Sequence, residues 1–172
     1  MSVEEHTITI LVNNQPGVLS RVAGVFSSRG YNIRTLCVAE TTDPAVSRIT
    51  LTSRASSDFT DKIKKQLDKL VDVIEVLDYS GARYIHRELM LVRVRSDRER
   101  IGELLRAVEI LGCRILSRHK DALVLEVTGD REESTAVLAY LEQFGILEAN
   151  RTGYIALERP GTHSVVLPIV GA

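Results

Sequence analysis

The residues best suited to bind a small ligand form one short loop near the start of the chain. The segment Asn14-Gln-Pro-Gly17 separates a β-branched stretch, His6–Val12, from an amphipathic one that begins at Val18. Glycine permits close approach of the backbone, and a helix beginning beyond it offers unpaired N–H groups at its positive dipole end. Such a loop can hold an anion such as an α-carboxylate, and the Asn14 amide can bind either charged end of a zwitterion. The alternative is an ordinary turn, which the same residue types also form.

Asn32 is a second polar residue that could take part in binding. It follows Arg29-Gly30-Tyr31 and opens another β-like segment. Because the intervening helix is short, we expect this segment to return beside the first strand, so that Asn32 faces the loop of a neighbouring chain. The alternative interpretation is a polar turn residue at the start of a strand.

The sequence offers little for catalysis. Its histidines are scattered and form no HExxH or paired metal-ligand spacing: His6, His86, His119 and His163. GxSxG, P-loop and GxGxxG motifs are also missing. Cys37 and Cys113 lie in separate β-like segments and are expected to be buried, reduced thiols. We therefore predict no catalytic residue and no metal site.

Composition and charge exclude several other classes of protein. The chain has 172 residues, 44% hydrophobic and 26% charged, which excludes disorder, collagen-like repeats and coiled-coil arrays. Its 22 Lys and Arg balance 23 Asp and Glu, so nucleic-acid binding is not expected. The first residues are acidic where a signal peptide needs basic ones, and no apolar run approaches about 18 residues. We expect a cytoplasmic protein that contacts no membrane.

The hydrophobic pattern predicts the elements that position the loop. From residue 5 to 79 it indicates the order βαββαβ, with strands at 6–12, 31–40, 45–53 and 71–77 and helices at 18–29 and 58–70. The lysine run Lys62-Ile-Lys-Lys65 lies opposite the apolar face of the second helix, so we interpret it as a solvated surface.

The same order repeats in the second half of the chain. Strands are predicted at 84–94, 113–118, 122–128 and 146–157, and helices at 98–111 and 132–144. Apolar residues coincide when the halves are aligned on Gly30 and Gly112: Phe26 with Val108, Val22 with Leu104, Leu19 with Ile101, and Ile33 with Ile115. The two halves are therefore interpreted as two units of one topology.

The second unit lacks the glycine loop. Where the first has Asn14-Gln-Pro-Gly17, the second has Ser96-Asp-Arg-Glu-Arg100. Ser96 or Asp97 is a reasonable N-cap for the following helix, but no glycine allows close approach of a ligand. Effector binding is expected in the first unit only.

These patterns predict an α+β protein of two tandem ferredoxin-like βαββαβ domains. The domains are expected at 1–79 and 84–158, with a linker at 80–83 and a tail, 159–172, to which no structure is assigned. Each four-stranded antiparallel sheet should carry both helices on one face and leave the other uncovered. Because units of roughly 75–90 residues with an open face are marginal alone, we expect the chain to form homo-oligomers.

Several longer segments carry a family resemblance. They are Asn14–Val22, Phe26–Ile33, Leu36–Thr42 with Ser47–Thr50, Lys65–Val73 and Arg87–Val94. Over about residues 5–158 the chain resembles the small regulatory subunits of acetolactate synthase, also called acetohydroxyacid synthase. The Pro-Gly loop alone resembles the ACT domain, a widespread amino-acid-sensing module.

The resemblance implies a function without catalysis in this chain. The first domain would be an ACT domain, and the chain would hold no cofactor. Its partner would be a large catalytic subunit that uses thiamin diphosphate, Mg and FAD. The chain would activate this subunit and confer feedback inhibition by valine or a related branched-chain amino acid, bound between the paired ACT domains of a homodimer.

The resemblance also assigns the effector-binding residues by position. They are Asn14, Gly17, Val18 and Leu19 from one chain, and Asn32 and Ile33 from the other. Many ACT modules have Asp where Asn14 stands here, which leaves open what binds the ammonium group of the effector.

Two rival functions remain. One is a free-standing ACT-type amino-acid sensor or transcriptional co-regulator, against which the missing basic patch and DNA-binding helix pair count. The other is a small enzyme on a ferredoxin-like fold, against which the missing cluster of nucleophile and base counts.

Overall fold

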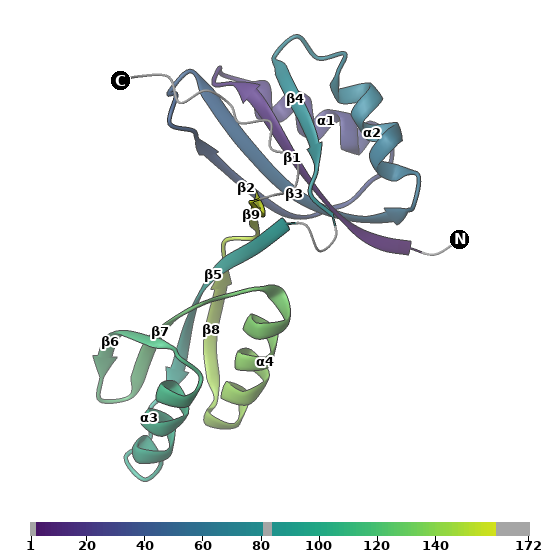
Figure 1. Ribbon diagram of the computed structural model, residues 1–172. Coiled ribbons are helices and arrows are strands. Elements are labelled where there is room, and N and C mark those ends of the chain that lie inside the picture. Colours follow the sequence, from purple (N-terminus) through teal and green to yellow (C-terminus); the bar gives the residue numbers. More distant parts are fainter. Residues whose placement is uncertain (1–2, 81–83, 161–172) are drawn as a thin grey trace. The chain divides into compact units, whose positions relative to one another are not determined.

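The chain folds into two compact units. The computed structural model describes residues 3–80 and 84–160 (Figure 1). The described residues up to Ile85, together with those from Tyr154 onward, form the first unit, and His86–Gly153 form the second. The expected second domain, 84–158, differs from this unit at its C-terminal end. Residues 81–83 of the expected linker and 161–172 of the expected tail lie outside the described residues.

The first unit has the predicted order βαββαβ. Its strands are β1 (Val3–Asn13), β2 (Ile33–Glu40), β3 (Val46–Ser56) and β4 (Val73–Asp78), and its helices are α1 (Val18–Ser28) and α2 (Phe59–Leu67). All three strand pairs are antiparallel, in the sheet order β2-β3-β1-β4. The expectation that β2 lies beside β1 is wrong, because β3 occupies that position.

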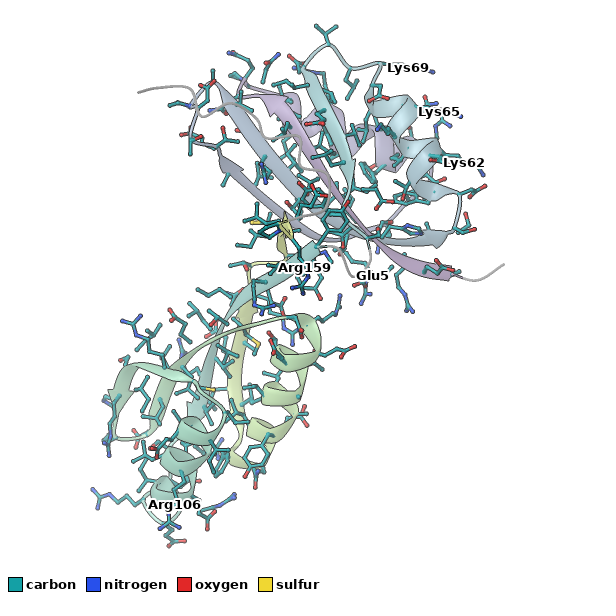
Figure 2. All side chains as sticks on the ribbon, viewed as in Figure 1. Glu5, Lys62, Lys65, Lys69, Arg106 and Arg159 are labelled. Atoms are coloured by element: carbon teal, nitrogen blue, oxygen red, sulfur yellow. The ribbon has the colours of Figure 1, made fainter. Side chains whose placement is uncertain are left out.

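Both helices of this unit cover one face of the sheet (Figure 1). Ile8 and Ile10 on β1 stand opposite Leu51 and Ile49 on β3 and face the helices. Phe26 of α1 and Phe59 of α2, each 0% exposed, complete this core with their rings 6.2 Å apart. Each helix buries one apolar stripe against the sheet, and its opposite side faces solvent and is polar. Figure 2 shows Lys62 and Lys65 pointing outward from α2, as the solvated-surface interpretation predicts, and Lys69 pointing outward just after the helix.

The opposite face of the first sheet is rich in threonine and is partly covered by the end of the chain. Thr9 and Thr50 stand opposite one another on this face and are 0% and 2% exposed. A short strand, β9 (Ile155–Glu158), shares a cavity of about 290 Å³ with β2 and β3. Tyr79 stacks on Tyr84 with ring centroids 4.3 Å apart, and burial raises the pKa of the Tyr79 phenol. The uncovered face expected here is therefore covered in part by the chain itself.

The second unit repeats the topology. It contains β5 (Tyr84–Arg95), α3 (Ile101–Ile110), β6 (Arg114–His119), β7 (Ala122–Gly129), α4 (Arg131–Leu141), a 3-10 turn η1 (Glu142–Phe144) and β8 (Ile146–Arg151), in the sheet order β6-β7-β5-β8. The expected strand at 146–157 is two strands, because the chain breaks at Gly153 with φ +81° and continues as β9, which pairs with β5. The predicted fold class, α+β with two βαββαβ sheets, is confirmed.

Corresponding turns show how closely the units match. After α1, Gly30 has φ +71° and the Tyr31 N–H donates to the Phe26 carbonyl; after α3, Gly112 has φ +65° and the Cys113 N–H donates to the Val108 carbonyl. These are the positions on which the two halves of the sequence align. A positive φ is what glycine adopts without strain, so both helices end in the same way.

The starts of the helices are less regular. The N-cap of α3 is Arg100, without a side-chain hydrogen bond, so the expectation of Ser96 or Asp97 is wrong. The chain makes a turn at residues 98–100, in which the Arg100 N–H donates to the Asp97 carbonyl, and the helix begins only after it. By contrast, α4 has a complete capping box between Asp130 and Glu133.

Candidate functional site

The Pro-Gly loop delivers the chain into α1 with its first amides uncapped. Gly17 is the N-cap residue with φ +81°, a left-handed conformation that glycine adopts without strain. No side chain caps the helix, and its first turn carries no acidic residue. The first N–H groups of a helix have no partner inside it. The Val18 N–H donates to the Gln15 carbonyl at 3.3 Å, and the N–H groups after it present donors at the positive dipole end of α1.

Arg21 adds a positive charge one turn into the helix. Its Nε donates to the Asp72 carboxylate at 3.0 Å, which holds the side chain beside the loop. A Cβ placed on Gly17 would lie 3.2 Å from Nη1 of Arg21. The space beside Gly17 is therefore narrow, and the positive charge of Arg21 is balanced by its ion pair with Asp72, so the preference for an anion rests on the helix start.

Asn14 is fixed by the turn between β2 and β3. Its side-chain Nδ2 donates to Glu40 Oε1 at 3.0 Å and to the Pro44 carbonyl at 2.9 Å, and its backbone N–H donates to the Ala45 carbonyl at 2.7 Å. With both amide hydrogens used, Oδ1 remains an acceptor. Asn14 Oδ1 and the Glu40 carboxylate can together bind an ammonium group.

Glu40 is the functional candidate that the sequence prediction missed. It lies at the end of β2, far along the chain from Asn14. No local pattern marks it, because only the sheet topology brings the β2–β3 turn to the end of β1. Its carboxylate supplies the acidic group that the asparagine in the loop does not.

The predicted apolar contacts divide into one exposed and one buried side chain. Leu19 is 41% exposed, whereas Val18 is 3% exposed and belongs to the hydrophobic core. Leu19 can therefore contact a ligand with its side chain, whereas the Val18 side chain is buried and its backbone N–H donates to the Gln15 carbonyl at 3.3 Å.

The two remaining site residues lie at the other end of the sheet. Asn32 is exposed and precedes β2, where its carbonyl accepts a hydrogen bond from Ser53 Oγ at 2.9 Å; Ile33 is partly buried against the core. Glu40 ends the same eight-residue strand, so Asn32 and Asn14 are separated by about 25 Å at roughly 3.3 Å per residue. One chain does not bring the two groups of residues together.

The other titratable candidates show no shared site. Among residues 3–80 and 84–160, no group of three His, Cys, Asp or Glu could hold a metal ion. His6 is 6% exposed and packs on Phe59 with ring centroids 5.2 Å apart. The thiols of Cys37 and Cys113 are free and half-buried, and burial raises the pKa of Cys113. His163 lies outside the described residues.

The helices were also compared with the length and hydropathy that a membrane-spanning helix needs. None of those within residues 3–80 and 84–160 is both long enough and apolar enough to span a bilayer.

Comparison with known proteins identifies the family. Residues 8–75 match the family model of the AHAS small subunit-like ACT domain, and residues 87–160 match that of the small subunit of acetolactate synthase. The chain is 43% identical to the probable acetolactate synthase small subunit of Methanothermobacter thermautotrophicus over 161 residues, which cover 92% of this chain and 95% of that one. The chain belongs to the family of acetolactate synthase small regulatory subunits.

Further relatives of this family agree. The acetolactate synthase small subunit of Mycobacterium bovis is 36% identical over 92% of this chain and 95% of its own length. The crystal structure of the acetolactate synthase small subunit from Thermotoga maritima superposes with a TM-score of 0.85 at 34% identity, over 91% of this chain and 98% of that one. The resemblance read from the sequence is confirmed, including an ACT domain in the first half of this small subunit.

Proposed function

We propose that this small subunit binds the large catalytic subunit of acetolactate synthase, raises its activity and makes it sensitive to feedback inhibition by valine. Membership of the small-subunit family implies association with a large subunit. In this proposal the thiamin diphosphate, Mg and FAD of the reaction are held by the catalytic subunit, and this chain supplies regulation.

The observation that carries the proposal is the pairing of Asn14 with Glu40 beside an uncapped helix start. The two ends of an α-amino acid need opposite partners. The amides of Gly17 and Leu19 favour the carboxylate, and Asn14 Oδ1 with the Glu40 carboxylate favours the ammonium group. An ordinary turn needs neither of these features.

A second copy of the chain would complete the pocket. β2 is at the edge of the sheet, and its outer edge pairs with no strand that the structure describes. If two copies pair antiparallel along β2 about a two-fold axis, the Ile33 end of one strand meets the Glu40 end of the other. Asn32 and Ile33 of one protomer would then face Asn14 and Leu19 of its partner, and the apolar side chains would surround an aliphatic ligand.

Regulation follows if valine binds one arrangement of this dimer more tightly than another. A ligand shifts an equilibrium only through its different affinities for the two states. A valine that bridges two protomers fixes their pairing geometry, and with it the surface presented to the catalytic subunit.

The test is an activity assay of the reconstituted complex. Acetolactate formation by the catalytic subunit is measured with and without this chain and across a valine titration. The wild-type chain should raise the rate and confer inhibition. Gly17→Asp should abolish inhibition and keep activation, because it places a strained, negatively charged side chain where the carboxylate of valine binds.

Gly17→Ala and Asn32→Ala serve as the matched variants. Gly17→Ala introduces the backbone strain without the charge, and it should weaken inhibition less than Gly17→Asp. Asn32→Ala should weaken inhibition although Asn32 lies at the opposite end of the sheet from Gly17 within one chain. If Gly17→Asp responds normally to valine, the site is elsewhere; if the chain does not co-purify with the catalytic subunit, a free-standing sensor is the better description.

A further inference from the structure

The second unit has a cavity at the position that the candidate site occupies in the first. Ser96 follows β5 as Asn14 follows β1, and its N–H donates to the Asp121 carbonyl at 2.9 Å, the counterpart of the bond from Asn14 to Ala45. The end of β5, the start of α3 and the β6–β7 turn meet around a space of about 310 Å³. Its lining residues are Ser96, Arg98, Ile101, Arg118, His119 and Lys120.

The charge around this cavity is strongly positive. Arg98 and Arg118 form no ion pair with any residue within 3–80 or 84–160. Lys120 Nζ lies 4.0 Å and His119 Nδ1 lies 3.9 Å from the Asp121 carboxylate, which offsets part of the charge. Two guanidinium groups therefore remain without a counter-ion in one small space, an arrangement suited to a doubly charged anion.

Ser96 adds a hydroxyl group to the lining of the cavity. The residue is 7% exposed, and its side chain is positioned to donate a hydrogen bond to a ligand there. The ten-residue helix α3 begins beside it, and no side chain caps its N-terminal amides. A bound oxyanion could accept hydrogen bonds from both the hydroxyl and the amides.

We propose that this cavity binds a phosphate-type oxyanion, either inorganic phosphate or the phosphate group of a small metabolite. Arg98 and Arg118 would contact its oxygens with their guanidinium groups, the Ser96 hydroxyl would donate a third hydrogen bond, and the α3 amides would face the remaining charge. The site belongs to the second unit, and it does not depend on valine binding in the first.

The test is calorimetric titration of the full chain with pyrophosphate, inorganic phosphate and a nucleoside monophosphate at constant ionic strength. Saturable binding at one site per chain is expected. Arg98→Gln and Arg118→Gln together should abolish it, and Ser96→Ala should weaken it about 10-fold, the value of one hydrogen bond to a charged group. Arg106→Gln is the matched control, since Arg106 lies further along α3 and does not line the cavity (Figure 2).

The outcomes distinguish a phosphorylated metabolite from a free phosphate ion, and both from a surface that docks a protein. Tighter binding of the nucleotide than of pyrophosphate supports a phosphorylated metabolite, and the reverse order supports a free phosphate ion. Binding that Arg106→Gln weakens as much as the double variant does would overturn the site. The proposal is also wrong if none of the three anions binds and the double variant instead fails to associate with the catalytic subunit, because the basic surface would then be a protein-docking face.

Discussion

The two units of this small subunit share a topology but differ at the junction where the first strand meets the first helix. In the first unit Asn14 donates to Glu40, the last residue of β2; in the second, Ser96 lies in a cavity with Arg118, which occupies the corresponding place near the end of β6. The junction of the first unit combines a carboxylate with an uncapped helix start. The junction of the second unit combines arginines with an uncapped helix start. The same fold therefore offers a site for a zwitterion in one unit and for an anion in the other.

The two units also differ on the sheet face that lies opposite the helices. In the first unit this face is packed with threonines and is partly covered by β9. In the second it carries ion pairs, such as Arg93 with Glu148 at 3.2 Å and Arg114 with Glu126 at 3.7 Å. The topology specifies where a face lies, and the residues on it decide whether it is covered or solvated.

The difference between the two cores gives the largest expected effect. Phe26 in α1 and Val108 in α3 are equivalent and buried, at 0% and 4% exposed. Phe26→Ala should cost about 4 kcal/mol of stability and Val108→Ala about 2 kcal/mol, because the larger side chain leaves the larger cavity. Native-state hydrogen exchange of the full chain, followed at β1 and β5 amides, measures each unit separately. Equal losses of stability in the two units would show that their cores depend equally on these two positions.

An exchange of charge at the first junction tests the comparison most directly. Glu40→Arg gives the first unit the charge that Arg118 gives the second, and it places a cation where the ammonium group of valine is proposed to bind. The valine concentration for half-inhibition should rise roughly 10- to 100-fold, the value of one charge-assisted hydrogen bond. Valine titrations of the reconstituted enzyme measure this value.

The control for that exchange is Asp61→Arg, which makes the same change of charge on the exposed surface of α2. It should leave inhibition unchanged. If both variants shift the response equally, the effect arises from net charge, and Glu40 has no specific part in binding.

The sequence predicted the elements well because hydrophobic periodicity depends on local spacing. The order βαββαβ, the match of the two halves about Gly30 and Gly112 and the apolar faces of the helices were all predicted. The sequence did not predict that β2 lies at the sheet edge or that Asn14 pairs with Glu40, because strand order is decided by packing over the whole unit. The break at Gly153 was missed since the apolar pattern continues across it.

At the junction of the second unit, too, residues that are distant in the sequence come together only in the fold. The missing glycine in Ser96-Asp-Arg-Glu-Arg100 led to the prediction that only the first unit binds the effector, and the pattern gave no sign of the oxyanion site proposed above. Arg118 and Lys120 belong to a different part of the sequence, and only the β6–β7 hairpin brings them to Ser96. Local composition alone therefore does not reveal a site that is assembled from a loop and a distant turn.

The smallest expected effect concerns how the helices begin. Asp130 accepts a hydrogen bond from the Glu133 N–H at 2.9 Å, and Glu133 Oε2 accepts one from the Asp130 N–H at 2.8 Å, whereas α1 and α3 have no side-chain cap. Asp130→Ala should lower the stability of the second unit by about 1 kcal/mol, measured by hydrogen exchange at β7 amides. Asp58→Ala is the control, because the Asp58 carboxylate bonds Ser56 and Lys62 rather than the amides of α2, and it should cost less. Equal effects would mean that the capping box adds nothing specific. A larger effect of Asp130→Ala would show that the capping box stabilises α4 in a way that α1, α2 and α3, which lack a side-chain cap, do without.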